Sequence, residues 1–285
     1  MRATRPGARR LALRVAAVVA AILTPATASA TYVSSSSSSF GLSENLTVTT
    51  AVGAMLTATI SPVNPVSGTA PPAYNLSQSV ASFTSTVTGV ETTSTGVIVD
   101  TAFSDALTGG VTKASSTVND LNLGVVPNPI AALTLVSLTA TTVQSTAQVT
   151  GDFGAIVTSG TTILTNPVLS ILGVNIALSS NPAPNTTVDL TAAGLAGVTL
   201  ILNERILGGD GITTATITTN AIHLRFTATP LGGGATINGD VIVAQSMATL
   251  LTRAVPEPAS VALLGVGAAL LGVARLRAGR ARSRA

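Results

Sequence analysis

Threonine and serine make up much of the long middle part of this sequence, and they limit the folds open to it. Residues 31–254 contain 41 Thr and 24 Ser among 224 residues. Threonine is branched at Cβ, which lowers its helix propensity and suits the half-buried surface of a pleated sheet. A segment of this composition is therefore predicted to be built from β-strands.

Apolar residues recur in this segment in the patterns of strands. Residues 46–49 and 221–226 alternate between apolar and polar, whereas 198–202 and 240–244 have the nearly continuous apolar character of central strands. Many short strands with Gly- and Pro-rich turns between them predict an all-β fold, with a single β-sandwich-like domain over residues 41–248. A β-solenoid is the second possibility because it also favours Thr and Gly, although no repeat of fixed period supports it.

Charged residues are few and unevenly placed. They make up 9% of the chain, against roughly 25% in ordinary globular domains. Residues 31–254 hold four basic and ten acidic residues, a balance of −6, so the excess of positive charge lies at the two ends. This distribution excludes a nucleic-acid partner, which requires a basic patch on the folded domain. The chain has no Cys and one His, which excludes Cys-ligated zinc, disulfides and a thiol nucleophile, and no cofactor is expected.

The first 30 residues have the parts of a secretory signal peptide. Five arginines precede an unbroken apolar run at residues 15–23. Ala28 and Ala30 supply the small side chains that signal peptidase accepts, so the mature chain is expected to begin at Thr31. The alternatives are a short helix of the mature fold and a twin-arginine signal, which this sequence fits only loosely.

Two short segments are predicted to connect the domain to the ends of the chain. Residues 31–40 contain six consecutive serines, the composition of a flexible spacer. Residues 249–260 are predicted to be a linker that contains the sequence Val255-Pro256-Glu257-Pro258. The prolines hold this sequence extended and leave one carboxylate between them, which suits recognition by an enzyme.

The C-terminal end has the arrangement of a stop-transfer segment. Residues 261–274 carry no charge, and five arginines follow within residues 275–285. The positive-inside rule places such a cluster in the cytoplasm, so a hydrophobic transmembrane segment at 261–274 and an Arg-rich cytoplasmic tail are predicted. The apolar run is short compared with the ~20 residues of an ordinary spanning helix.

The order of Pro-Glu-Pro, apolar segment and Arg cluster resembles the PEP-CTERM sorting signal over about the last 31 residues. The resemblance implies that an exosortase, a membrane enzyme of Gram-negative bacteria, recognises Pro256, Glu257 and Pro258 and that the tail is lost during sorting. It also implies a host that makes exopolysaccharide and biofilm matrix. A permanent C-terminal membrane anchor is the alternative.

The body of the chain, roughly residues 40–250, is similar to the choice-of-anchor P family of secreted bacterial proteins. The similarity rests on strand-like stretches at 188–190, 198–204, 220–224 and 239–244. It implies a location at the cell surface and supplies no catalytic residues.

Few side chains of the body offer catalytic or binding chemistry. His223, the one imidazole, alternates with an apolar face and is expected to face solvent or a sheet edge, outside any Ser-His-Asp triad. Asp189, Glu204, Asp210 and Asp240 lie near predicted strand ends, but their spacing selects no pair for glycoside hydrolysis. The Gly-rich turn at Asp210 has too few carboxylates for a calcium site. Two Tyr and no Trp leave little aromatic surface for stacking on sugars.

These features predict a secreted, non-catalytic structural or interaction protein of the cell surface or extracellular matrix. The expected partners during export are signal peptidase, exosortase and, transiently, the inner membrane. Exopolysaccharide or other copies of the chain are the expected partners after sorting. The alternative is an extracellular carbohydrate-binding module or an enzyme that acts on exopolysaccharide.

Overall fold

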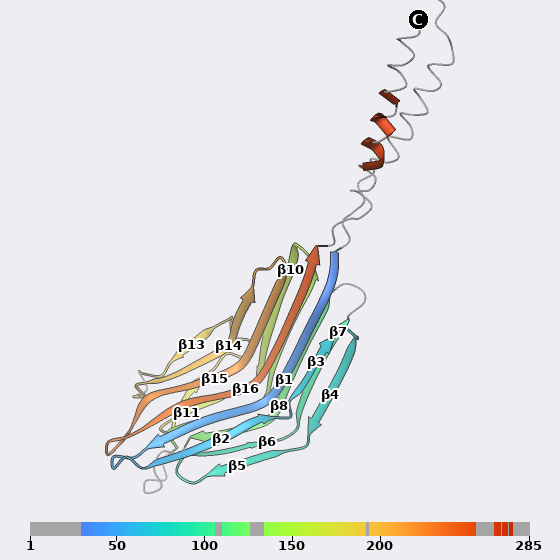
Figure 1. Cartoon of the computed structure of the whole chain (residues 1–285). Coiled ribbons are helices and arrows are strands. Elements are labelled where there is room, and N and C mark those ends of the chain that lie inside the picture. Colours follow the sequence, from blue (N-terminus) through green and yellow to red (C-terminus); the bar gives the residue numbers. More distant parts are fainter. Residues whose placement is uncertain are drawn as a thin grey trace, which may run out of the picture. The chain divides into compact units, whose positions relative to one another are not determined.

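The computed structural model describes residues 30–105, 110–125, 134–191 and 194–254, together with 265–268, 270–272 and 274–275 near the C-terminus. The chain divides into two compact units, and the larger one spans Tyr32–Arg253. This unit is a sandwich of two antiparallel sheets, which confirms the predicted all-β class (Figure 1). The alternative of a β-solenoid is wrong, because the strands pair in long antiparallel ladders within each sheet.

The first sheet has seven strands within the described residues. Their order places β1 next to β16, so that β1 begins beside the end of β16 at one end of the sandwich (Figure 1). In spatial order the strands are β13 (Thr186–Asp189), β14 (Val198–Gly209), β15 (Thr214–Gly232), β16 (Ala235–Ala254), β1 (Ala30–Thr49) and β2 (Met55–Val63), with β3 (Val66–Ala70) also paired to β1.

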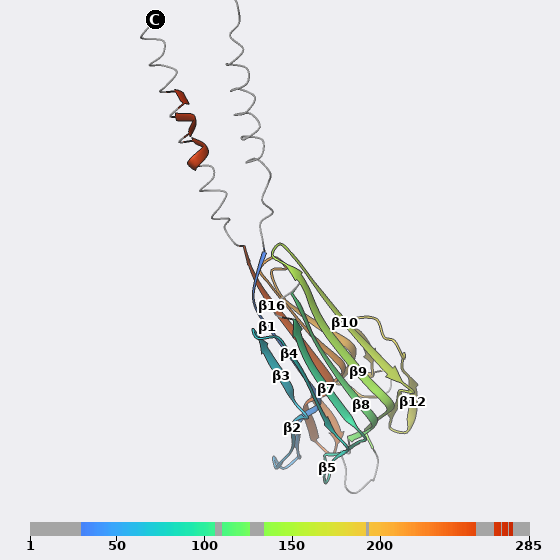
Figure 2. The same cartoon turned by 90° about the vertical axis from the view of Figure 1, so that its right-hand side faces the viewer.

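The second sheet has nine strands in the described part of the chain, and its long central strands run side by side in Figure 2. In spatial order they are β12 (Val174–Ala177), β11 (Val168–Ile171), β9 (Val136–Asp152), β8 (Val111–Val125), β6 (Glu91–Thr95) and β5 (Phe83–Val87), with β10 (Ala155–Thr165) on β9, β7 (Ile98–Asp105) on β8 and β4 (Tyr74–Val80) on β7.

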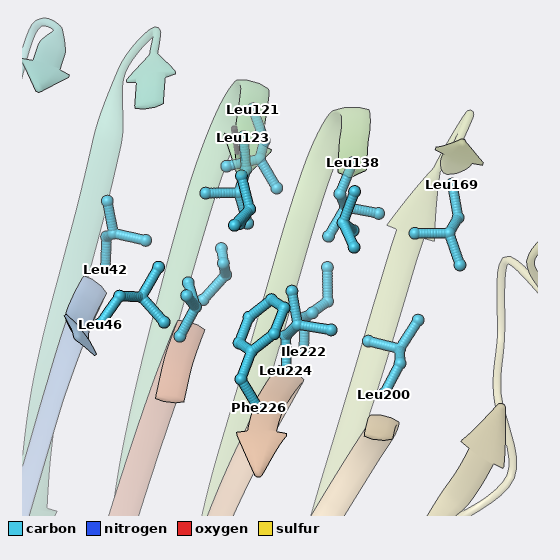
Figure 3. Packing of buried hydrophobic residues seen from close by; sticks show 14 of the residues in the cluster. Leu42, Leu46, Leu121, Leu123, Leu138, Leu169, Leu200, Ile222, Leu224 and Phe226 are labelled. Atoms are coloured by element: carbon cyan, nitrogen blue, oxygen red, sulfur yellow. The ribbon is translucent and has the colours of Figure 1, made fainter. Parts of the chain in front are cut away.

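One half of the sandwich encloses a core of large apolar side chains. These side chains come from both sheets and meet between them (Figure 3). Each of them stabilises the fold by about 1.5–3 kcal/mol when it is fully removed from water. The fully buried members include Leu42, Leu46, Leu121, Leu123, Leu138, Leu169, Leu200 and Leu202.

The other half has many small side chains beside a smaller apolar cluster, and the two sheets approach each other closely there. A Cβ atom on Gly160 of β10 would lie 2.3 Å from Oγ1 of Thr219 on β15, in the opposite sheet. The Oγ atoms of Ser145 on β9 and Ser246 on β16 are 2.6 Å apart, a hydrogen bond between the sheets. Small hydroxyl side chains therefore share the contact surface of this half with a smaller apolar cluster that includes Val149, Ile217 and Leu250.

The strands change the face that they present to the interior where the two halves meet. In β8 the buried positions are 112, 114, 116 and 118 before this point and 121, 123, 124 and 125 after it. Asp120, which lies between these sets, has a left-handed φ of 49°. The partner strand β9 changes its inward face at the same level. The register of the two strands is therefore unchanged: Asn119 pairs with Thr142 before the change, and Leu121 pairs with Ala140 after it.

The Ser-rich segment is not a flexible spacer, because residues 31–40 form the first half of β1. Ser35, Ser37 and Ser39 are buried between the sheets, and this segment pairs with β3. The hydroxyl groups make burial possible: Ser39 Oγ donates to the carbonyl oxygen of Thr101 at 3.1 Å. Because side chains alternate along a strand, every second serine of the run points inward, and together these serines form an inner face of small, hydrogen-bonding side chains.

The predicted C-terminal linker is also shorter than expected, because β16 continues to Ala254 and includes residues 249–254. Residues 1–29, which are all of the predicted signal peptide except Ala30, lie outside the described residues. So do residues 255–260, with the Pro-Glu-Pro sequence. The predicted cleavage point between Ala30 and Thr31 falls at the first residues of β1.

The segment predicted to enter the membrane, residues 261–274, has helical backbone at its described positions. Among the described residues, no helix has the length and apolar character needed to cross a bilayer.

Candidate functional site

A polar network lies on the outer face of the seven-stranded sheet, where β14, β15 and β16 run side by side. The inward residues of β15 at this level are Ile222 and Leu224, so the alternation of the strand turns His223 outward. The ladder pairs His223 with Ile201 on one side and with Ile242 on the other. The two flanking strands thus place an isoleucine on each side of His223, and they also supply the polar partners of its ring.

Two carboxylates hold the imidazole from opposite sides. His223 Nδ1 lies 2.8 Å from Glu204 Oε2, and its Nε2 lies 3.1 Å from Asp240 Oδ1. The His223 side chain is only 13% exposed, so it faces outward as predicted but is mostly covered. Arg225 Nε lies 3.2 Å from the same Asp240 oxygen, in a pair that is about half exposed.

Two amides extend the network on the Glu204 side. Asn220 Nδ2 donates to Glu204 Oε2 at 2.6 Å, and Gln245 Nε2 donates to Asn220 Oδ1 at 2.8 Å. We call the six residues that are connected in this way the His223 network: Glu204, Asn220, His223, Arg225, Asp240 and Gln245.

The two carboxylates occupy both nitrogens of the imidazole. Only the doubly protonated ring donates from both nitrogens, and in that form His223 satisfies both carboxylates. A general base needs a ring nitrogen directed at a nucleophile or substrate, and both nitrogens of His223 are held by carboxylates. Glu204 and Asp240 stand on opposite sides of the ring and do not converge on one point, and the described residues contain no cluster of three or more metal-ligating side chains.

The structure brings together two of the four carboxylates that the sequence singled out and keeps the other two apart from them. Glu204 and Asp240 are brought together by His223, whereas Asp189 lies on β13 opposite Thr199 and Asp210 lies in the turn between β14 and β15. Thr213 Oγ1 donates to Asp210 Oδ2, and Oδ1 accepts from the backbone N–H groups of three following residues; these bonds hold the pKa of Asp210 well below the usual range. Its carboxylate therefore stabilises the turn.

Three acidic side chains in the interior were missed by sequence reasoning. Glu44, Glu91 and Asp100 are each at most 2% exposed. Burial, with the charge of Glu91, raises the pKa of Glu44 to about 8, and burial raises the pKa of Asp100 to about 6 against its hydrogen bonds. The alternation Leu42-Glu44-Leu46 was the available signal, because it puts Glu44 on the same strand face as two leucines.

Two open surface depressions lie at the side of the nine-stranded sheet, and they share Asn166. One is lined mainly by hydroxyl, amide and aliphatic groups and has no ionisable side chain, whereas the other includes Asp120. The lining residues of the first are Thr161, Ile163, Leu164, Thr165, Asn166, Ser180 and Asn181.

Residues 254–278 match the family model of the PEP-CTERM protein-sorting motif, which begins at the last residue of β16. The match indicates a secreted surface protein that is sorted by an exosortase. Comparison with curated proteins and with solved structures finds no match. The similarity of the body to the choice-of-anchor P family remains a prediction.

Proposed function

We propose that this protein is a non-catalytic structural or interaction component of the cell surface or of an extracellular, exopolysaccharide-associated matrix. The observation that carries the proposal is the sorting motif at residues 254–278, which directly follows the last strand of a β-sandwich. A motif of this kind delivers the domain in front of it, and that domain consists of hydroxyl-rich sheets.

Export is proposed to proceed in two cuts. Signal peptidase cleaves after Ala30 and leaves Thr31 as the first residue. The apolar segment 261–274 then associates with the inner membrane, with the Arg cluster on the cytoplasmic side, because arginines cross a bilayer at high free-energy cost. Exosortase recognises the sequence from Val255 to Pro258 and releases the sandwich from its tail.

The surface chemistry supports contact with polysaccharide or with other copies of the chain. No charged residue occurs between Asp152 and Asp189, a stretch that includes β10 to β12. The exposed face of β10 offers hydroxyl groups between small and aliphatic side chains, at Ser159 and Thr161 among others. Such a surface forms hydrogen bonds without the desolvation penalty of charged groups.

The non-catalytic part of the proposal rests on the His223 network. Its imidazole is the one ring of its kind in the sequence, and each nitrogen lies within 3.1 Å of a carboxylate oxygen. A substrate hydroxyl could reach neither nitrogen without displacing Glu204 or Asp240.

A specific carbohydrate-binding role is the second candidate, and the depression at Asn166 favours it. Thr161, Ser180 and Asn181 place hydroxyl and amide groups around one open hollow, which are the groups that bond to sugar hydroxyls. The wild type should then bind purified exopolysaccharide, and Asn166→Ala should not. This result would support sugar binding over a structural role, and the absence of released reducing ends would support it over an enzyme.

The proposal is tested by sorting of a Glu257→Ala variant. Glu257 carries the one charge of the Pro-Glu-Pro element, so its loss is expected to leave uncleaved precursor in the inner-membrane fraction. A matched control is Ser260→Ala, which leaves the Pro-Glu-Pro element intact and should be sorted like the wild type. Normal sorting of Glu257→Ala would contradict recognition of this element.

A further inference from the structure

Three segments of the sandwich meet at the end where its last strand stops. The turn between β9 and β10 lies at the same end as the last residues of β16 (Figure 2). The turn between β14 and β15 is bonded to both: Gly154 N donates to the carbonyl oxygen of Ile212 at 2.9 Å, and Thr252 N donates to that of Thr213 at 2.7 Å. We call this the tail end of the sandwich, because β16 stops there at Ala254.

Exposed apolar side chains gather at the tail end. Phe153, Ile212 and Leu251 belong to the three bonded segments and are 37%, 51% and 39% exposed. Val157 and Leu207 lie on the strands beside the two turns and are 62% and 65% exposed. Single exposed apolar residues are normal on a protein surface, whereas a group of them indicates an interaction site. We call these five residues the tail-end patch.

The charged side chains around the tail-end patch balance one another. Three acidic and three basic residues lie in the described turns and adjoining strand ends: Asp105, Asp152, Asp210, Lys113, Arg205 and Arg253. Such a rim gives no net attraction to a strongly charged partner. Removal of the apolar side chains from water is therefore the main driving force for any contact made here.

The length of the chain beyond β16 limits what the patch meets before sorting. This step rests on the proposed function, in which the segment 261–274 associates with the inner membrane. Six residues, 255–260, join that segment to the end of β16, and the extended backbone between them spans at most about 25 Å. Leu251 is three residues from the end of the strand, so the linker keeps the tail-end patch within reach of the bilayer.

We propose that the tail-end patch rests on the outer leaflet of the inner membrane until the tail is removed. A second copy of the chain fits the patch less well, because copies anchored in one membrane present their tail ends side by side and not face to face. Five partly exposed side chains also supply less area than the roughly 1,200 Å² that a specific protein interface buries. A bilayer requires no matching shape, and each apolar side chain that enters its interface adds to the binding.

This contact has a consequence for processing. It holds the sequence from Val255 to Pro258 at the membrane surface, where exosortase is proposed to recognise it. The contact is shallow and reversible, because a small apolar surface without an anchor binds a bilayer only weakly. Removal of the tail therefore releases the sandwich from the membrane.

The test uses the full chain, held in protein-free phosphatidylcholine vesicles. The sequence has no Cys, so Ile212→Cys provides a single site for a fluorophore that becomes brighter in an apolar environment. Val52→Cys is the matched control: Val52 is apolar and 91% exposed, but it lies in the turn after β1, at the other end of the sandwich. The label at residue 212 is expected to be severalfold brighter than the label at residue 52, and nitroxides on the lipid chains should quench it selectively.

A second variant removes part of the patch and keeps the label at residue 212. Phe153→Ser combined with Leu251→Ser changes two side chains that are more than a third exposed, so far-UV circular dichroism should be unchanged. The brightness of the label should fall towards that of the label at residue 52. An unchanged brightness would contradict contact through the patch.

The possible failures are distinguishable. A chain that floats with the vesicles but shows equal brightness at the two labels would overturn the contact alone. A chain that does not float would overturn the membrane anchor and the contact with it. Shielding of residue 212 that requires added exosortase would make the enzyme the partner in place of lipid. The readout needs no cleavage, so failed sorting is a separate result, which the intact mass of the surface protein reports.

Discussion

At the scale of single residues, the position of a polar side chain in its strand decides what it does. His223 alternates with the apolar residues beside it and faces out, whereas Glu44 shares the strand face of Leu42 and Leu46 and faces in. The outward residue finds two carboxylates from neighbouring strands, whereas the inward one finds no hydrogen-bond partner. The same alternation therefore produces a satisfied surface network and an unsatisfied interior acid.

Removal of the imidazole should destabilise the fold. His223→Ala removes the ring that joins Glu204 and Asp240 and leaves the mostly covered Glu204 carboxylate without one of its hydrogen-bond partners, so we expect a loss of about 1–3 kcal/mol in the free energy of unfolding. Urea denaturation of the variant and the wild type measures this loss. Arg225→Ala is the control: its ion pair is about half exposed, so it should change stability by at most about 1 kcal/mol. Equal losses in the two variants would contradict a central role for the ring.

Asp100 should make stability depend on pH in a defined direction. Burial raises the pKa of Asp100 from its usual 3.8 to about 6, so the folded state holds its proton more tightly than the unfolded state. The stabilisation is complete below about pH 3.8 and is lost as the pH rises through about 6. Between these pH values the unfolding free energy of the wild type should fall with rising pH, and in Asp100→Asn this fall should be smaller by on the order of 2–3 kcal/mol. Urea denaturation at several pH values measures the difference. An unchanged slope in the variant would show that other groups cause the dependence.

At the scale of elements, strand identity follows from local sequence but pairing does not. The alternation in 221–226 and the apolar run in 198–202 predict strands, and both lie in strands of the first sheet. The His223 network could not be predicted, because it depends on the register that sets Arg225 opposite Asp240 across a hairpin. The prediction of a flexible spacer at residues 31–40 is wrong for a related reason. The inner face of this strand is stabilised by hydroxyl partners that are distant in sequence, such as Ser104, 69 residues away from Ser35.

The close approach of the sheets in the half with many small side chains makes one glycine essential. Gly160→Ala would place a Cβ 2.3 Å from Thr219 Oγ1 and 3.3 Å from the carbonyl oxygen of Thr146. We expect overpacking to lower the free energy of unfolding by about 1–3 kcal/mol. Gly208→Ala on β14 is the matched control, because its nearest neighbour would be Thr216 Cβ at 3.7 Å. Comparable stability of the two variants in chemical denaturation would disprove close packing at β10.

At the scale of the whole molecule, the chain combines a folded sandwich with a C-terminal sorting motif. That motif could be recognised from sequence because it is a short, ordered pattern of charge, proline and apolar residues, whereas the signal peptide at residues 1–30 stays a prediction. The all-β class was equally accessible, since composition and alternation act along the whole body. The contact between the sheets was not, because it depends on which strands face each other across the core, and of the interior acids only Glu44 carried a signal, through its alternation with Leu42 and Leu46.

The sorting account is tested most directly by the intact mass of the native protein recovered from the cell surface or matrix. The account predicts a chain that begins at Thr31 and lacks the arginines between residues 275 and 285, with a C-terminus at or near the Pro-Glu-Pro sequence. The same measurement on cells without exosortase should give the chain with its tail, in the inner-membrane fraction. A surface protein that still carries Arg275 to Arg284 would contradict the account and show that the C-terminal segment is a permanent anchor.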